Sequence, residues 1–292
     1  MKKIIEVLKD KKVLVSDGAW GTFLHAKGLS PNESPELWNI ERPADVLEIA
    51  KAYVDAGANM ILTNSFGGSR LKLKDNGLAE RTFELNKAAA EISRKAAGDD
   101  IFVLGSIGPT GRMIMMGDTT PDELYDVFKE QSMALAEGGA NAILIETMSD
   151  MEEATIAVKA AKENTDREVI CTFTFEKTPL NEYRTMMGID PKGAVQSLKD
   201  AGADIIGANC GNGTAGMIEI VKEIRSIDQD IPVLVHANAG LPIIKNGETC
   251  FPENPDDMAS QINDLVSAGA NIVGGCCGTT PEHIKKIVAV LK

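Results

Sequence analysis

Short, wholly apolar runs recur along the chain and alternate with longer segments whose apolar residues have helical spacing. Four runs share one pattern, in which a helical segment reaches a glycine, passes through an alanine and an asparagine or aspartate, and continues into the run; they are residues 55–64, 137–146, 200–209 and 267–276. Glycine is typical of the position after a helix, and the runs have the length of strands. Because they are apolar throughout, we expect strands of a parallel sheet covered by helices.

Four further apolar runs lie between them, at residues 13–16, 101–105, 169–175 and 232–236. The chain thus reads as eight strand-then-helix units without a Pro- or Ser-rich linker. This predicts an α/β fold, a closed (β/α)8 barrel formed by residues 1–292 as one domain, and such barrels take about 250 residues. The alternative, an open doubly wound sheet, is disfavoured because no Gly-x-Gly-x-x-Gly phosphate loop follows the first strand.

Helix signals fill the spaces between the runs. Residues 43–56 and 78–97 have apolar positions at helical spacing, and residues 1–12 resemble an amphipathic first helix. Thr280 is followed by a proline and predicts the start of the last helix.

The predicted loop 108–120 carries three methionines, Met113, Met115 and Met116. It follows the third strand and belongs to the carboxyl-terminal face of the barrel. Its methionines have two readings that the sequence leaves open: they cover an apolar pocket or meet a partner, or they pack in the core.

Charge and cysteine content narrow the class of protein. The net charge of −13 argues against binding to nucleic acids or anionic membranes, since both use basic patches. No apolar run approaches the roughly 20 residues of a membrane span, and charges interrupt the N-terminal segment too often for a signal peptide. Five cysteines, an odd number, favour the reducing cytoplasm and thiol or metal chemistry over a disulfide framework.

Three of the cysteines stand at predicted strand ends. Cys276 and Cys277 are adjacent, lie between glycines and follow the last strand, and Cys210 has the matching place after another strand. Cysteines also pack in cores as small hydrophobic residues, which is the simplest alternative. Neighbours in sequence are poor disulfide partners, however, and the carboxyl ends of parallel strands meet at one edge. We therefore predict a zinc site of three thiolates at the carboxyl-terminal face of the strands, with a fourth position open to a reacting ligand.

Six motifs together resemble the homocysteine S-methyltransferase family, and most closely the N-terminal homocysteine-binding barrel of the cobalamin-dependent methionine synthases. The motifs span almost the whole chain; they are residues 17–22, 62–66, 144–147, 207–210, 238–242 and 274–281. The resemblance implies a zinc-dependent methyltransferase of methionine biosynthesis that methylates the thiol of homocysteine. One zinc ion per chain would be held by Cys210, Cys276 and Cys277, which are then both the metal ligands and the catalytic residues.

The resemblance also implies how the rest of homocysteine binds. Glu146 would contact the amino group, and backbone N–H groups around Asp17 and Gly18 would hold the carboxylate. Asn64 and Asn238 are further candidates for the substrate site. Asn209 is a candidate for lining the site or supporting it, and Asn238 is also a candidate for the fourth zinc ligand before substrate arrives.

The methyl donor is less directly indicated. Gly278 follows the paired cysteines, and residues 238–240 resemble the corrinoid-dependent type. We therefore expect a methylated corrinoid as co-substrate, supplied by a separate corrinoid protein or as a free cobamide. S-methylmethionine or betaine as donor, another thiol or a selenol as acceptor, and a non-catalytic zinc-binding barrel remain as alternatives.

The remaining histidines and cysteines have simpler predicted roles. We expect His25 on a helix surface, His283 in a structural role and Cys171 in the core. Cys250 reads as a loop thiol. His236 ends a strand on the active face, and whether it supports the site is left open.

Overall fold

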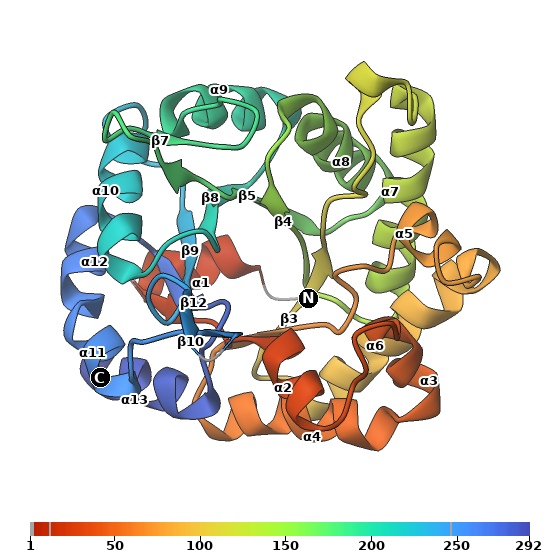
Figure 1. The fold of residues 1–292 in the computed structure, drawn as a ribbon, viewed down its shortest axis with the longest axis horizontal. Coiled ribbons are helices and arrows are strands. Elements are labelled where there is room, and N and C mark those ends of the chain that lie inside the picture. Colours follow the sequence, from red (N-terminus) through yellow and green to blue (C-terminus); the bar gives the residue numbers. More distant parts are fainter. Residues whose placement is uncertain (1–2, 12, 246) are drawn as a thin grey trace.

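The computed structural model describes residues 3–11, 13–245 and 247–292, and its centre is a barrel of parallel strands (Figure 1). The strands follow the order β1-β12-β9-β8-β5-β4-β3-β2 around the barrel. Their bounds are β1 Leu14–Val15, β2 Met60–Leu62, β3 Phe102–Ile107, β4 Ala142–Met148, β5 Glu168–Phe173, β8 Ile205–Asn209, β9 Val233–Ala237 and β12 Ile272–Gly275. All eight predicted strands are present, which confirms the (β/α)8, or TIM, barrel.

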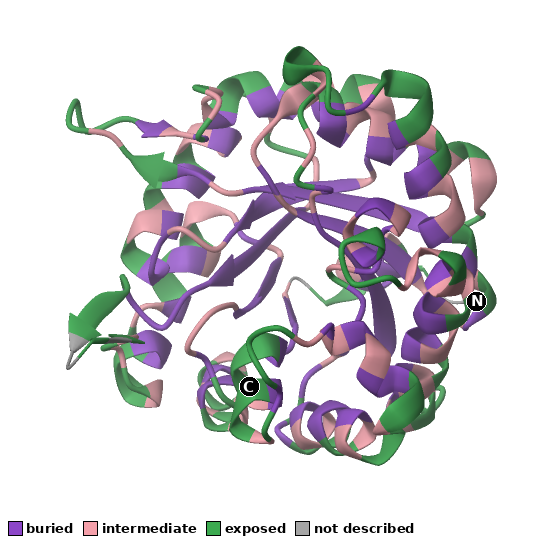
Figure 2. Cartoon of the chain, turned by 45° about the vertical axis from the view of Figure 1, so that its right-hand side comes forward, coloured by how far each residue is buried: buried purple, intermediate pink, exposed green. Residues whose placement is uncertain are grey.

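Helices surround the strands in Figure 1, and the residues between the two layers are buried (Figure 2). The longer outer helices are α4 Pro43–Asp55, α6 Thr82–Ala97, α7 Pro121–Glu137, α8 Met151–Asn164, α9 Pro191–Ala201, α10 Thr214–Arg225 and α13 Pro281–Leu291. The shorter ones are α2 Trp20–Ala26, α3 Trp38–Glu41, α5 Arg70–Lys74, α11 Pro255–Ser260 and α12 Ile262–Ala268. No helix in the described ranges is long and apolar enough to cross a membrane.

Most predicted helix boundaries are confirmed, with small shifts. Thr280 is the N-cap of α13. The His283 side chain accepts the Thr280 N–H at 3.1 Å and completes a capping box, so His283 has the structural role expected of it. The predicted helix 78–97 starts later, at Thr82, because a 3-10 turn, η2 Ala79–Arg81, precedes it. Of the predicted first helix, α1 Ile4–Asp10 is present, whereas residues 1, 2 and 12 lie outside the described residues.

The four repeated helix ends share one geometry. The glycines that follow α4, α7, α9 and α12 all have positive φ, with values of 94° at Gly57, 101° at Gly139, 98° at Gly202 and 118° at Gly269. Other residues resist this conformation, which explains why glycine recurs at this place.

The asparagine or aspartate two residues after each glycine pins one strand to the next. The four residues, Asn59, Asn141, Asp204 and Asn271, accept the N–H of Val15, Val103, Val169 and Val233 through their side chains at 2.9, 2.8, 2.7 and 3.0 Å. Their own N–H groups donate to the carbonyl oxygens of the same valines at 2.7, 2.7, 2.8 and 2.9 Å. The repeat is therefore structural, a role that the sequence analysis did not assign.

The Asn59 clamp also lies where the barrel closes. β1 and β2 are the two ends of the strand order, and Asn59 holds Val15 across this seam. Farther along, the Asp17 carboxylate accepts the Leu62 N–H at 2.7 Å. At the amino-terminal end of the barrel, α1 is anchored by Glu168, the first residue of β5. The Glu168 carboxylate accepts the N–H groups of Ile4 and Ile5 at 2.6 and 3.0 Å.

Two small hairpins extend from the carboxyl-terminal end of the barrel and project at the left of Figure 2. One pairs β6 Glu176–Lys177 with β7 Tyr183–Arg184 after β5, and the other pairs β10 Ile243–Lys245 with β11 Glu248–Cys250 after β9. The prediction that Cys250 is a loop thiol was therefore wrong in detail, since Cys250 ends a hairpin strand opposite Ile243. Cys171 is buried in β5, as predicted.

Candidate active site

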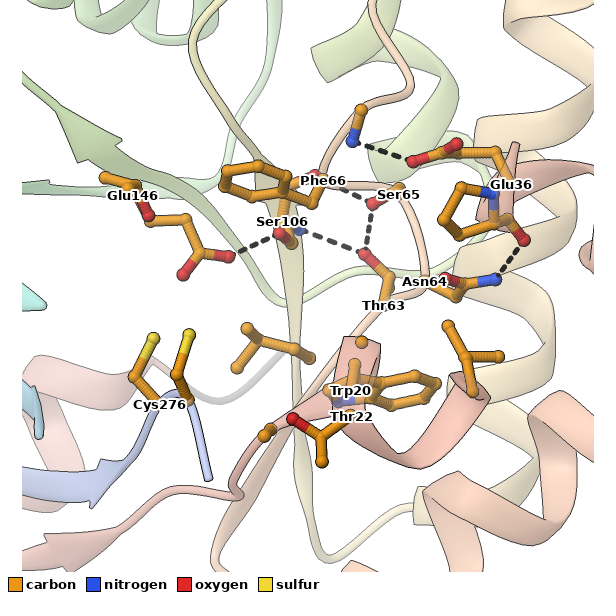
Figure 3. A pocket seen from close by; sticks show the side chains of 18 of the residues that line it. Trp20, Thr22, Glu36, Thr63, Asn64, Ser65, Phe66, Ser106, Glu146 and Cys276 are labelled. Carbon is orange, nitrogen blue, oxygen red and sulfur yellow. Dashed lines mark hydrogen bonds between the residues drawn. The ribbon is translucent and has the colours of Figure 1, made fainter. Parts of the chain in front are cut away.

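A pocket of about 750 Å3 opens at the carboxyl-terminal end of the strands. Its walls come from segments far apart in sequence: the start of α2, residues 31–36, the ends of β2, β3, β4 and β9, and the cysteines after β8 and β12. In Figure 3, Glu146 and Cys276 face the cavity on one side, and Trp20 and Phe66 line opposite walls.

Cys210, Cys276 and Cys277 converge in this pocket. Their sulfur atoms all lie within 4.8 Å of one another, and Cys210 Sγ is 3.9 Å from Cys277 Sγ. This is the one group of potential metal ligands of its kind in the part of the chain that the structure describes. The convergence predicted from two separate strand ends is thus present.

The backbone around the cysteines explains the glycines beside them. Cys210 has a φ of 58°, and its N–H donates to the His236 carbonyl oxygen at 3.0 Å. Gly278 has a φ of 79°, and a Cβ there would come within 2.4 Å of the Phe251 side chain. Glycine at 278 thus lets the loop after the paired cysteines pack tightly against Phe251.

The three thiols share negative charge unequally. Hydrogen bonds from Cys276, and next from Cys277, lower the pKa of Cys210 well below its ordinary value. The same contact with Cys210 raises the pKa values of Cys276 and Cys277. A bound divalent cation would instead lower the pKa values of all three thiols, because it stabilises their thiolates, and zinc favours thiolate ligands. The donor set therefore fits zinc, with a fourth coordination position open.

Glu146 is buried in the wall of the pocket near these sulfurs. It lies near the end of β4, where the pairing with β5 shifts register between Ile145 and Met148. Ser106 Oγ donates a short hydrogen bond to Glu146 Oε1 (Figure 3). Burial raises the pKa of Glu146 to about 7, an effect that the Ser106 hydrogen bond opposes. A cationic ligand beside this carboxylate would favour its charged form.

Asp17 lies behind the pocket wall, whereas Gly18 lines it. The Asp17 carboxylate accepts hydrogen bonds from Trp20 Nε1 at 2.8 Å and the Leu62 N–H at 2.7 Å. The neighbouring Ala19 N–H donates to Thr279 Oγ1 at 3.1 Å. Of the two predicted residues, Gly18 is therefore the one whose backbone faces the cavity, and carboxylate binding there stays a prediction.

The two predicted asparagines occupy different places. Asn64 lines the pocket, and its amide donates to the Pro35 carbonyl oxygen at 2.7 Å and to Asn39 Oδ1 at 3.1 Å. It thereby supports the pocket segment 31–36. Asn238 instead lies outside the pocket wall, where its side chain helps to lower the pKa of Cys210, and its Oδ1 has no partner among the described residues. Their contacts with substrate or zinc stay predictions.

His236 also lines the pocket, deeply buried. Burial lowers its pKa to about 4, so the ring is neutral at physiological pH. Its Nε2 has no hydrogen-bond partner within the described part of the chain. His25, in contrast, is exposed on α2, as predicted.

The sequence analysis missed the hydroxyl groups around Glu146. Ser106 N–H donates to Thr63 Oγ1 at 2.9 Å, Thr63 Oγ1 lies 2.6 Å from Ser65 Oγ, and Ser65 Oγ donates to the Ser106 carbonyl oxygen at 2.7 Å. Thr63 and Ser65 stand inside the motif 62–66, so a signal was available for them. Ser106 was missed because the third strand was predicted to end at residue 105, whereas β3 continues to Ile107.

Comparisons with known proteins identify the family of this chain. The sequence profile described as Homocysteine S-methyltransferase matches residues 14–291. Methionine synthase of Mycobacterium tuberculosis (strain ATCC 25618 / H37Rv) is 34% identical over 304 residues, covering 99% of this chain and 25% of that protein. Methionine synthase of Mycobacterium leprae (strain TN) is 32% identical over 297 residues, covering 96% and 24%. The chain thus spans about a quarter of the length of these relatives.

Among solved structures, the Escherichia coli homocysteine methyltransferase MmuM has the same fold. Its metallated form aligns with a TM-score of 0.81 and 21% identity over 97% of this chain and 98% of that chain. Its oxidized form aligns with a TM-score of 0.80 and 22% identity over 99% of both chains. The family that the sequence motifs indicated is confirmed by the profile and the relatives. The chain belongs to the homocysteine S-methyltransferase family.

Proposed function

We propose that this protein transfers a methyl group from a methylated corrinoid to the thiol of homocysteine, giving methionine, with one zinc ion held by Cys210, Cys276 and Cys277. The corrinoid would arrive on a separate protein or as a free cobamide, and the reaction would serve methionine biosynthesis in the cytoplasm. The observation that carries this proposal is that three cysteine sulfurs and one buried carboxylate, Glu146, face the same pocket.

The pocket provides complementary groups for both ends of homocysteine. The thiol would lie at the cysteine cluster, and the ammonium beside Glu146. Because the pKa of Glu146 is raised to about 7 by burial, the arriving ammonium would pull the carboxyl group into its charged form. Ser106 would hold the carboxylate in place during binding, and the Gly18 N–H would donate to the substrate carboxylate.

Methyl transfer needs the substrate sulfur as a thiolate, and a free thiol has a pKa of about 8.5. Bound zinc supplies a Lewis acid that holds a thiol in its deprotonated form at neutral pH. The thiol proton leaves to solvent, the sulfur forms a bond to the methyl carbon, and the carbon–cobalt bond breaks with its electron pair left on cobalt. A thiol with a lowered pKa is a weaker nucleophile. Three anionic cysteine ligands would offset this loss by keeping the substrate sulfur electron-rich.

The surface around the pocket supports a large donor. Exposed apolar side chains lie on each of the three segments that follow the carboxyl ends of β3, β5 and β9; they are Met113, Met115, Met116, Leu180, Met186, Leu241, Ile243 and Ile244. Leu180 and Ile244, one on each hairpin, are 80% and 74% exposed. Exposed apolar surface of this kind is typical of interaction sites. The methionines of loop 108–120 are therefore not core residues, and we assign them to contact with a corrinoid protein.

The test is to mix zinc-loaded protein with methylcob(III)alamin and homocysteine without oxygen, following the corrinoid spectrum and assaying methionine. We expect demethylation of the corrinoid matched by methionine and abolished by a chelator. Parallel reactions contain S-methylmethionine or betaine. Methionine from one of these donors but not from the corrinoid would show that the proposed donor is wrong. Failure with every donor, together with unchanged homocysteine binding in Glu146→Ala, would favour a non-catalytic zinc-binding barrel.

A further inference from the structure

We propose that Asn209 is a positioning residue that sets the Glu146 carboxylate relative to the cysteine cluster by holding a strained bulge in β4. The proposal rests on the proposed function in one respect, namely that Glu146 binds the substrate ammonium. Asn209 ends β8, is fully buried and precedes Cys210. It differs from Glu146 in having no contact with the cavity, so it would act through its neighbours.

The bulge places a residue with an unusual backbone conformation, Thr147, next to Glu146. β4 carries one extra residue between Ile145 and Met148, which pair with Cys171 and Phe173 of β5. Thr147, in this bulge, has a φ of 62° and is one of three non-glycine residues with positive φ in the described ranges. A β-branched residue rarely adopts this conformation, so the surrounding structure must hold it there.

The Asn209 side chain supplies that hold. Its Oδ1 accepts the Thr147 N–H at 2.7 Å, and its Nδ2 donates to Thr147 Oγ1 at 2.7 Å. The same Oδ1 accepts the Thr172 hydroxyl of the intervening strand β5 at 2.7 Å. The amide therefore reaches from β8 across β5 to β4 and pairs with both the N–H and the hydroxyl of Thr147 in the bulge.

This contact connects the segment of Glu146 with the segment of Cys210. Glu146 precedes the clamped Thr147, and Cys210 follows Asn209 with its own left-handed φ of 58°. Without the clamp, we expect Thr147 to relax toward an extended conformation. Because side chains alternate between the two faces of a strand, such a relaxation would turn the Glu146 carboxylate away from its present direction.

The test compares two thiols binding to the zinc-loaded protein by calorimetry. Homocysteine carries the ammonium that Glu146 would bind, whereas 4-mercaptobutanoate has the same thiol and carboxylate without it. Loss of an oriented charged hydrogen bond should weaken homocysteine binding to Asn209→Ala by about tenfold or more, and leave 4-mercaptobutanoate binding and zinc content near wild type. Asn86→Ala is the matched control, since Asn86 is a buried asparagine that bonds to Gly68 and Thr82 outside the pocket.

A second substitution tests the strain directly. Glycine adopts positive φ readily, so Thr147→Gly should make the clamp dispensable. We expect the Asn209→Ala/Thr147→Gly double variant to recover most of the homocysteine affinity lost in Asn209→Ala. If Asn209→Ala does not fold, the double variant is compared with Thr147→Gly alone, and their homocysteine affinities should agree within about threefold by the same reasoning.

Several results would overturn the proposal. Equal weakening of both thiols, loss of zinc, or unchanged homocysteine affinity in Asn209→Ala would each show that Asn209 does not position Glu146. A large difference between the double variant and Thr147→Gly would do the same. Glu146→Ala separates this proposal from the proposed function: if that variant also binds homocysteine normally, the ammonium site itself is wrong, and the role of Asn209 falls with it.

Discussion

The Asp17 carboxylate accepts a hydrogen bond from the Leu62 N–H at 2.7 Å, across the seam between β1 and β2. The same oxygen, Oδ2, accepts Trp20 Nε1 at 2.8 Å, and Trp20 lines the pocket. One buried carboxylate therefore joins the first two strands beside the site and fixes an aromatic wall of the cavity. Asp17 serves the site through this framework, while its neighbour Gly18 faces the cavity.

The first prediction concerns this seam. In Asp17→Ala, the Leu62 N–H and Trp20 Nε1 both lose the oxygen that accepts them. We expect a loss of about 1–3 kcal/mol in the free energy of unfolding, measured by urea denaturation of zinc-loaded protein, because a buried donor is left unpaired. Tryptophan fluorescence should report a changed environment for Trp20. Unchanged stability would contradict a structural role for Asp17.

The second prediction is a pH dependence that comes from Glu146. Its pKa is raised from 4.5 to about 7 by burial, so between these pH values the folded protein keeps a proton that the unfolded chain releases. Stability from this group therefore falls as pH rises through that window, and the penalty is complete above about pH 7. Without homocysteine, Glu146→Gln should lack this decline. Its stability relative to wild type should therefore be higher at pH 8 than at pH 4.5.

The measurement is the difference in unfolding free energy between wild type and Glu146→Gln across this pH range. Both proteins contain the cysteines and Asp17, whose pKa burial also raises to about 7, so the comparison removes most of their own titration. A pH-independent difference would mean that folding does not shift the pKa of Glu146. In the same variant we expect weaker homocysteine binding, because the neutral amide has no charge to offer an ammonium.

The third prediction concerns the repeated strand clamp. Asn271 Oδ1 accepts the Val233 N–H at 3.0 Å and Arg225 Nη2 at 2.8 Å. Asn271→Ala leaves both donors without this acceptor, so we expect a loss of about 1–3 kcal/mol in the free energy of unfolding. Zinc content should not change, since Asn271 lies at the amino-terminal end of β12 and the cysteines lie beyond its other end. Loss of zinc without loss of stability would contradict this assignment.

The strands and the cysteines show what the sequence can predict here. Uniformly apolar runs identified all eight strands, and residues that follow the carboxyl ends of parallel strands share one edge of the barrel. That rule brought Cys210 together with Cys276 and Cys277 from positions far apart in the chain. It also placed Glu146 in the same pocket.

What the sequence could not predict depends on register and on contacts across strands. The extra residue that puts Thr147 in a bulge has no local signal, since β4 reads as an ordinary apolar strand. Asn209 was named as a residue that lines or supports the site. It is absent from the pocket wall, and its side chain reaches two strands away to Thr147, a contact that follows from barrel geometry alone. The hairpin that contains Cys250 forms inside a connection, where a three-residue strand leaves too short a pattern to recognise.

The last prediction tests the metal centre residue by residue. Replacing Cys210, Cys276 or Cys277 by alanine leaves two thiolates, one fewer than the three protein ligands of an open zinc site. We expect each variant to lose bound zinc, measured by elemental analysis, and to lose methyl transfer with it. Cys250→Ala is the matched control, because this thiol lies on the β10–β11 hairpin outside the cluster, and its zinc content and activity should stay near wild type. A metal-free Cys276→Ala protein with full activity would refute the zinc mechanism, whereas zinc loss in Cys250→Ala would show that the hairpin supports the metal centre.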